Sequence, residues 1–202
     1  MMTRDSEDGM GAHQVLSPRI LRAVNVAAAA HDGHYRKGSG IPYVSHIFSV
    51  MHVASKQGLD PEIEEDVLIA CLLHDTIEDV PEKYSSEDIL ADFGPQVLDF
   101  VLSVTKDSSL PNWQARAHAY IERLNAAPYG AVVVAACDKL HNLSSMLADH
   151  EQVGEALWQR FSSAKEDQKW WYQAIYDVVE RRAPGLPLLP EYAVKLRRLE
   201  SL

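Results

Sequence analysis

Residues 131–145 read AVVVAACDKLHNLSS, and their conformation decides the fold class. A short β-branched run of this kind is typical of a buried strand as well as of a buried helix. A helix is favoured here, because the helical period continues through Asp138, His141 and Asn142 with no turn residue between them. We therefore expect a buried helix that turns polar at its carboxyl-terminal half.

Helix start signals recur on both sides of this stretch. Ser17-Pro18, Asp60-Pro61 and Ser86 are typical of helix amino-termini. The apolar spacing after these signals predicts helices over residues 18–31, 45–58, 61–80, 86–93, 95–106, 112–126 and 156–181, and a short basic helix at the carboxyl end. No alternating strand pattern is present, so the sequence predicts an all-α fold with about eight to ten helices in one bundle.

Length and composition set the domain organisation. The chain has 202 residues, 47% of them hydrophobic and 24% charged, which suits one soluble globular domain. Residues 1–16 are expected to be a disordered amino-terminal segment, and residues 17–182 to form the domain. Residues 183–202 are expected to be a carboxyl-terminal linker with a short helix that packs on the same domain. The aromatic residues of the last third are expected in the core, with an oligomer surface as the alternative: Trp158, Trp170, Trp171 and Tyr172.

Charge and cysteine usage exclude several classes of protein. A formal net charge of −10 argues against a protein that coats nucleic acid or anionic membranes. No apolar run is long enough to span a bilayer, and the first residues do not resemble a secretory signal. Cys71 and Cys137 lie in apolar stretches and are expected to be buried thiols in a reducing compartment, so we expect a cytoplasmic protein. Nine histidines make a metal or acid–base site worth seeking.

The segment LLHDTIEDV (residues 72–80) is the strongest local feature. On the predicted helix, His74 and Glu78 lie four residues apart, as do Asp75 and Asp79, so they form two stacked pairs. A helix that emerges from the core and turns polar would also carry acids. That alternative explains less well why a histidine and an aspartate directly follow buried leucines, where unpaired charge is costly.

Two further clusters carry polar groups of the same kind. CDKLHNLSS (residues 137–145) places Asp138, His141 and Asn142 at helix-face spacings, although a hydrogen-bonded helix end would do so too. HDGHYRKGSGIPYVSH (residues 31–46) holds Arg36 and Lys37 between glycines and ends at a histidine, His46; a solvated loop is the alternative. The three clusters together become a strong signal only if they meet in space.

Ligand chemistry gives a reason for them to meet. His46, His74, Asp75 and Asp138 offer two imidazoles and two carboxylates, a set suited to one divalent transition metal ion with an open position. Such an ion lowers the pKa of water and neutralises phosphate charge. Glu78 and Asp79 could then orient that water or move a proton.

The ordered set RKGSGIPYVSH, LLHDTIEDV, VTKD and DKLHN resembles the HD-superfamily hydrolases of guanosine tetra- and pentaphosphate alarmones, the hydrolase half of the Rel/SpoT enzymes. The length is closer to that of the stand-alone small alarmone hydrolases. The resemblance implies a single HD domain that removes pyrophosphate from the 3′ position of ppGpp or pppGpp and gives GDP or GTP. A chain of this length has no room for a separate synthetase domain, so we expect hydrolysis only.

The resemblance also implies roles for individual residues. The metal ligands, usually of manganese, fall on His46, His74, Asp75 and Asp138, and the catalytic acidic pair falls on Glu78 and Asp79. Nucleotide contacts fall on Arg36, Lys37 and Asn142. In our mechanistic hypothesis the guanidinium of Arg36 stacks on the base, while Lys37, Lys106 and Lys139 balance phosphate charge. The expected partner is a small-molecule nucleotide, with no nucleic acid and no membrane.

Two departures from the family pattern concern the substrate. The loop from Lys37 to His46 is one residue longer than in the long enzymes, so no base contact is assigned to Gly38 or Ser39. Ser144 stands where the family commonly has arginine. The alternatives are an HD-type phosphohydrolase for another nucleotide, such as ppApp, a nucleoside monophosphate or the 2′-phosphate of NADPH. A non-catalytic nucleotide-binding regulator is the alternative from another class.

Overall fold

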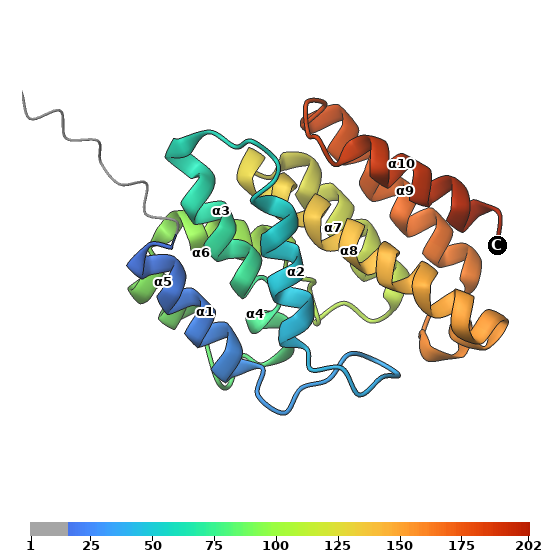
Figure 1. The fold of residues 1–202 in the computed structure, drawn as a ribbon, viewed down its shortest axis with the longest axis horizontal. Helices are drawn as coiled ribbons and strands as arrows, with labels where there is room; N and C mark the ends of the chain where they lie inside the picture. Colours follow the sequence, from blue (N-terminus) through green and yellow to red (C-terminus); the bar gives the residue numbers. More distant parts are fainter. Residues whose placement is uncertain (1–15) are drawn as a thin grey trace, which may run out of the picture.

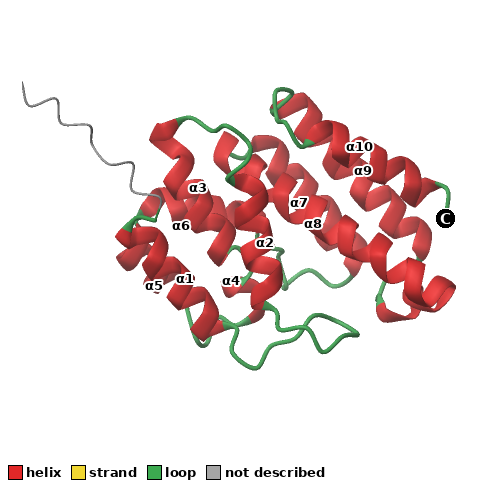
Figure 2. Ribbon diagram, in the orientation of Figure 1, coloured by secondary structure: helices red, strands yellow, loops and turns green. Residues whose placement is uncertain are grey.

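The computed structural model describes residues 16–202, and the segment predicted to be disordered lies outside this range apart from Leu16. The elements are α1 (Pro18–Ala30), α2 (Val44–Ala54), α3 (Pro61–Leu73), α4 (Thr76–Asp79), α5 (Ser86–Phe93), α6 (Pro95–Val104), α7 (Trp113–Ala126), α8 (Tyr129–Val153), the 3₁₀-helix η1 (Gly154–Arg160), α9 (Lys165–Arg182) and α10 (Leu189–Glu200). Figures 1 and 2 show this helical bundle. Among residues 16–202 there is no strand, only an isolated bridge between Tyr35 and Pro42, so the all-α prediction is confirmed.

The helix α8 organises the bundle. It packs against α2, α3, α6, α9, α10 and η1, and all residues from Gly130 to Leu140 are buried. An element covered on all sides shows no amphipathic period, which is why the sequence of this stretch also suited a strand. The prediction of a helix here is confirmed. The bundle continues into α10, which packs on α8 and α9 (Figure 1).

The first turn of α8 depends on a glycine. A Cβ added to Gly130 would lie 2.4 Å from Cζ of Phe100, whose ring is buried in the core. We expect Gly130→Ala to lower the free energy of unfolding by about 1–3 kcal/mol, because the ring has no free space to move into. Urea denaturation measures this. Gly185→Ala, whose added Cβ meets no atom within 4 Å, is the control, and an equal loss in both variants would contradict the packing argument.

The long helix predicted over residues 61–80 is wrong in one respect, because it breaks at His74 and Asp75. The side chains explain the break. His74 Nδ1 lies 2.9 Å from the carbonyl oxygen of Cys71, and Thr76 Oγ1 donates to the carbonyl of Leu73 at 2.7 Å. These side chains occupy carbonyls that backbone N–H groups would otherwise reach. The chain therefore re-enters a helix only at Thr76.

The predicted helix over residues 156–181 is also interrupted. The structure has the 3₁₀-helix η1 first, then extended residues at Phe161 and Ala164, and then α9. Asp167 Oδ2 accepts a hydrogen bond from the Ala164 N–H at 3.0 Å, which fixes the start of α9. A smaller correction concerns α5, which is capped by Ser85 in a capping box with Asp88 and not by Ser86.

Burial confirms some of the predicted core and corrects the rest. Both cysteines are buried free thiols. Trp171 and Tyr172 are buried as expected, and Trp158 is half-buried against the core. Trp170, however, is 38% exposed and lies against His118 on the outside of α7, with ring centroids 4.7 Å apart. None of the described helices is long and apolar enough to cross a membrane.

Candidate metal centre

Three separate elements bring the predicted metal ligands together. His46 lies in the first turn of α2, His74 and Asp75 lie at the end of α3, and Asp138 lies in the middle of α8. One potential ligand atom each of His46, His74 and Asp75 lies within 4.8 Å of the others. Asp138 Oδ1 approaches the same point, 3.3 Å from His46 Nε2 and 3.7 Å from His74 Nε2. The carboxylate of Asp75 lies 3.0 Å from His74 Nε2 and 3.4 Å from His46 Nε2.

The orientation of both imidazoles fits a bound metal ion. Their Nε2 atoms are buried and have no hydrogen-bond partner within residues 16–202, although two carboxylates lie beside them. Their Nδ1 atoms are engaged, that of His46 with His141 Nδ1 at 2.8 Å and that of His74 with the carbonyl of Cys71 at 2.9 Å. With protons on both Nδ1 atoms, both Nε2 lone pairs are free for a cation. The residues present therefore fit a divalent metal ion.

The charge balance of the centre points the same way. Burial alone would favour neutral carboxyl groups, yet His74 holds the pKa of Asp75 well below its usual range, and Lys139, His46 and His74 do the same for Asp138. Both carboxylates are thus ionised at neutral pH. Burial also opposes charge on His74, but Asp75 and Asp138 raise its pKa. The site strongly favours positive charge between its two carboxylates, which a divalent cation supplies.

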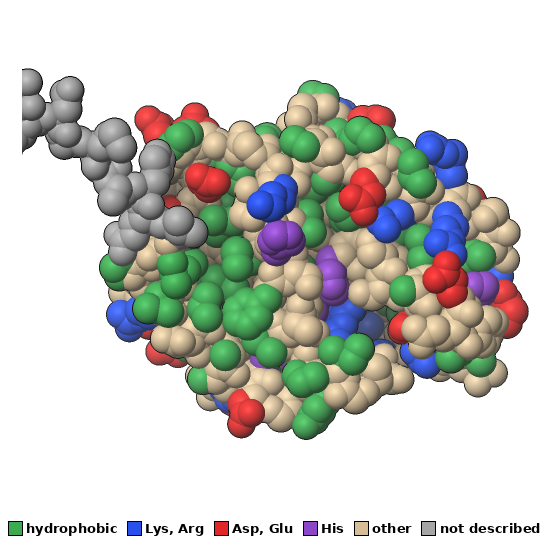
Figure 3. Space-filling view, in the orientation of Figure 1, with side chains coloured by type: hydrophobic (Ala, Val, Ile, Leu, Met, Phe, Trp, Pro, Cys, Tyr) green, Lys and Arg blue, Asp and Glu red, His purple; other side chains and the backbone are tan. Residues whose placement is uncertain are grey.

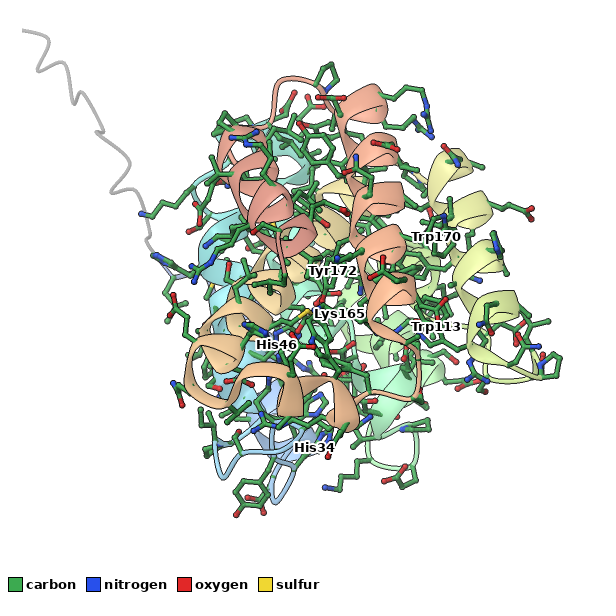
Figure 4. All side chains as sticks on the ribbon, turned by 90° about the vertical axis from the view of Figure 1, so that its right-hand side faces the viewer. His34, His46, Trp113, Lys165, Trp170 and Tyr172 are labelled. Atoms are coloured by element: carbon green, nitrogen blue, oxygen red, sulfur yellow. The ribbon has the colours of Figure 1, made fainter. Side chains whose placement is uncertain are left out.

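A stack of aromatic rings supports Asp75 from the loop side. Tyr43 Oη donates to Asp75 Oδ2 at 2.6 Å. The Tyr43 ring stacks on His34 and His31, with centroids 4.2 Å and 4.9 Å away. His34 lies below His46 in Figure 4, on the loop that leads into α2. Tyr43 and His141 were not assigned roles from the sequence, although both lie in the motifs that were quoted for the family resemblance.

His31 makes the stability of the fold pH-dependent. It is buried, with 2% of its surface exposed, and burial lowers its pKa from 6.5 to about 4. The unfolded chain binds this proton first as the pH falls, so His31 reduces stability between pH 6.5 and pH 4, by about 3 kcal/mol at most. We expect the unfolding free energy from urea denaturation to fall less steeply over this range in His31→Gln than in the wild-type protein. Parallel pH profiles would show that His31 is not responsible.

The predicted catalytic acids follow the break in the helix. Glu78 accepts hydrogen bonds from the backbone N–H of Lys106 at 3.0 Å and from its Nζ at 3.3 Å. Partial desolvation in the pocket, with the negative charges of Asp75 and Glu78, raises the pKa of Asp79 to about 6. Because the helix breaks at Asp75, the pairing of Glu78 with His74 and of Asp79 with Asp75 on one continuous helix does not position these acids. Glu78 is fixed instead by the loop that follows α6.

A pocket of about 890 Å³ adjoins the metal centre. It is lined by both acids of the predicted catalytic pair and by all predicted substrate-binding residues: Arg36, Lys37, Lys106, Lys139 and Asn142. In Figure 3 the surface is hollowed below and to the right of the middle of the view, with histidine beside the hollow and Lys or Arg side chains within it. The pocket therefore combines an acidic metal centre with surrounding positive charge.

Hydrogen bonds connect the predicted substrate residues to the centre. Arg36 donates to Asn142 Oδ1 at 2.8 Å, and Asn142 Nδ2 in turn donates to Asp138. Lys139 is buried and paired with Asp138. The Nζ atoms of Lys106 and Lys139 lie 6.0 Å and 5.8 Å from the ring centroid of Trp171, so both cations border the same aromatic wall.

The carboxyl-terminal third contributes pocket residues that were not expected from the sequence. Gln168, Trp171 and Tyr172 of α9 and Arg160 of η1 line the pocket. In Figure 4 Tyr172 lies above His46, while Trp113 and Trp170 lie apart from them on the α7 side. No sequence motif marks these residues. The tryptophan-rich composition indicated only a core or an oligomer surface.

Comparisons with known proteins agree with this geometry. The chain matches the family model described as HD domain over residues 23–164. The guanosine-3′,5′-bis(diphosphate) 3′-pyrophosphohydrolase MESH1 of Danio rerio is 34% identical over 128 residues, which are 63% of this chain and 68% of that protein. The corresponding enzyme of Drosophila melanogaster is 34% identical over 131 residues, or 64% and 70% of the two chains. A GTP pyrophosphokinase of Streptomyces coelicolor is 35% identical, but the match covers only 15% of that protein.

Solved structures give the same result. A structure described as a metazoan ortholog of SpoT that hydrolyzes ppGpp and plays a role in starvation responses superposes with a TM-score of 0.71. The sequences are 27% identical, and the match covers 91% of this chain and 96% of that one. A second structure, lmo0812 from Listeria monocytogenes, has a TM-score of 0.67 and 28% identity, with 78% and 99% of the chains covered.

Proposed function

The chain belongs to the HD domain family and to the group of the MESH1 pyrophosphohydrolases, and on that premise we propose that it hydrolyses ppGpp-type alarmones. The reaction removes pyrophosphate from the 3′ position of the nucleotide and leaves GDP or GTP. One observation carries the proposal: two buried imidazoles present unpartnered Nε2 atoms between two ionised carboxylates, beside a pocket lined by six lysine or arginine side chains. This combination suits a substrate with several phosphate groups.

The proposed metal site uses His46, His74, Asp75 and Asp138. A divalent cation held there supplies charge neutralisation for the 3′ diphosphate and lowers the pKa of a water molecule. We propose manganese as the ion, although nitrogen and oxygen ligands of this kind also accept iron, cobalt and zinc. His141 and Tyr43 hold the ligands in place, since each bonds directly to one of them.

The acidic pair is proposed to handle protons. Glu78 is oriented by two hydrogen bonds from Lys106, so its carboxylate can hold a water molecule in the attacking direction. Asp79 has a pKa raised to about 6, which lets it accept and return a proton near neutral pH. Both side chains line the pocket, where substrate and solvent can reach them.

Basic residues are proposed to bind the nucleotide. Arg36 lies with its guanidinium carbon 5.6 Å from the centroid of the Tyr43 ring and is held by Asn142, so its planar group is oriented for stacking on a purine. Lys139 and Lys106 border the metal centre, where they balance charge on the 3′ diphosphate and on the leaving pyrophosphate. Lys37 contributes a positive charge from the loop.

A panel of substrates tests this proposal. Purified protein loaded with Mn²⁺ should release pyrophosphate from ppGpp and pppGpp faster than from ppApp, and should release no phosphate from NADPH. Turnover of NADPH alone would assign the site to a 2′-phosphate instead. Binding of ppGpp without turnover of any compound would support the non-catalytic alternative. The comparison with ppApp tests the preference for guanine, which rests on the similarity to the guanosine-3′,5′-bis(diphosphate) 3′-pyrophosphohydrolases.

A further inference from the structure

The outer wall of the pocket contains an arginine that the motifs did not indicate. Arg160 ends the 3₁₀-helix η1 and lines the pocket opposite the loop of residues 36–41. Figure 1 shows this loop reaching across to the segment that follows α8. The two segments are far apart in the sequence, so nothing in either one alone marks the contact.

Gly38 makes this contact possible. A Cβ added at Gly38 would lie 2.7 Å from both Cδ and Nε of Arg160, and Gly38 has a φ of +74°. Any other residue at this position would both strain the loop and displace the arginine side chain. The Arg160 side chain therefore lies against Gly38, the residue that follows Lys37.

The position of Arg160 along the pocket follows from α8. Its Nη1 donates to Asp149 Oδ2 at 3.1 Å. Asp149 lies eleven residues after the ligand Asp138 on the same helix, about 16 Å further along the axis at 1.5 Å per residue. Asp149 lines the pocket, and so do Asn142 and Ser145, which lie between these two points on α8. Arg160 is thus held at the end of the pocket away from the metal centre.

The charges at this end are available to a ligand. Arg160 uses one of its five N–H donors for Asp149, and its side chain is 26% exposed. Lys37 is exposed, lines the pocket and has no ion pair within residues 16–202. By contrast, Lys106 and Lys139 at the other end are paired with Glu78 and Asp138. Lys106 and Lys139 are thus engaged beside the metal ligands, whereas Arg160 keeps free donors further along the pocket.

We propose that Arg160, with Lys37, binds the 5′ phosphates of the substrate while its 3′ diphosphate lies at the metal centre. The inference rests on the proposed function and adds a second anion-binding position about three helical turns from the first. It takes nucleotides that carry phosphate groups at two separate positions. A planar guanidinium with free donors suits such a phosphate chain, because it can bond two oxygens at once.

Kinetics with two substrates test the proposal. We compare ppGpp with guanosine 3′-diphosphate, which lacks 5′ phosphates, in the wild-type protein, Arg160→Ala and Arg160→Lys. The Arg160→Ala change should raise KM for ppGpp by about ten- to hundred-fold with little effect on kcat, because it removes binding equally before and during the reaction. KM for guanosine 3′-diphosphate should stay at the wild-type value. The KM of Arg160→Lys for ppGpp should lie between those of the wild-type protein and Arg160→Ala, since lysine keeps the charge and loses the paired donors.

Controls separate this from a general charge or folding effect. Lys56→Ala removes an exposed positive charge outside the pocket and should leave both KM values unchanged. An equal rise in KM for both substrates in Arg160→Ala would show a structural role, and no rise for ppGpp would show that Arg160 serves only its ion pair with Asp149. Either result overturns the proposal.

A binding measurement keeps the inference separate from the proposed reaction. If the wild-type protein hydrolyses neither substrate, the proposed function fails, and calorimetry with GDP and guanosine still tests Arg160. We expect Arg160→Ala to weaken GDP binding by about ten- to hundred-fold and to leave guanosine binding unchanged. Equal affinities of both proteins for GDP would reject the second anion-binding position.

Discussion

Replacing Asp75 by alanine is expected to reduce the rate of pyrophosphate release from ppGpp by about a thousand-fold or more. Asp75 lies 3.0 Å from His74 Nε2 and 3.4 Å from His46 Nε2, and it is the only one of the four proposed ligands that also accepts a hydrogen bond from Tyr43 in the described residues. Removing it takes away one of two carboxylates and leaves the imidazoles with Asp138 alone. The site should then lose both its metal affinity and its charge balance.

Two measurements distinguish this loss from unfolding. Metal analysis of the purified protein should show that Asp75→Ala retains much less Mn²⁺ than the wild-type protein, while circular dichroism should show the same helical content. Asp99→Ala, which removes an exposed acid of α6 outside the pocket, should behave as the wild-type protein in both respects. Full pyrophosphate release by metal-depleted Asp75→Ala would mean that these residues do not form the reactive centre.

Replacing Glu78 by glutamine is expected to lower kcat by about 10²- to 10⁴-fold. Glutamine has the same shape, and its oxygen can still accept the hydrogen bond from the Lys106 N–H that positions Glu78 at 3.0 Å. The variant therefore removes the charge and proton affinity of the side chain and keeps its position. Metal content should not change, because Glu78 is not among the proposed ligands.

The neighbouring acid provides the comparison. Asp79→Asn should also lower kcat, since its pKa of about 6 suits proton exchange near neutral pH. The two acids differ in their surroundings, because the Lys106 hydrogen bonds are made to Glu78 alone. If both variants kept the wild-type kcat with a normal metal content, proton handling by this pair would be rejected.

The elements that were predicted correctly are those with local signals. The buried helix at residues 131–142 follows from the helical spacing of its polar residues and the absence of turn residues, and it places Asp138 beside the end of α3. The His74-Asp75 doublet was identified because charge directly after buried leucines needs a partner. His46 completes the set, since two imidazoles and two carboxylates together suit a divalent metal ion. These residues do meet in space.

The parts that were missed depend on tertiary contacts. The break after Leu73 arises because the side chains of His74 and Thr76 compete for helix carbonyls, which a periodic pattern does not show. Trp170 faces outward because its neighbour Trp171 takes the buried direction on α9. Arg160 reaches the pocket only because Gly38, far away in the sequence, leaves room for it. Such long-range contacts leave no mark in a single local segment.

The hydrolysis of ppGpp followed by ³¹P NMR tests the central claim most directly. With Mn²⁺-loaded wild-type protein, the resonances of the 3′ diphosphate should disappear while inorganic pyrophosphate and GDP appear in equal amounts, and Asp75→Ala should leave the spectrum unchanged. Release of orthophosphate, loss of the 5′ phosphates, or an unchanged spectrum with the wild-type protein would contradict the account.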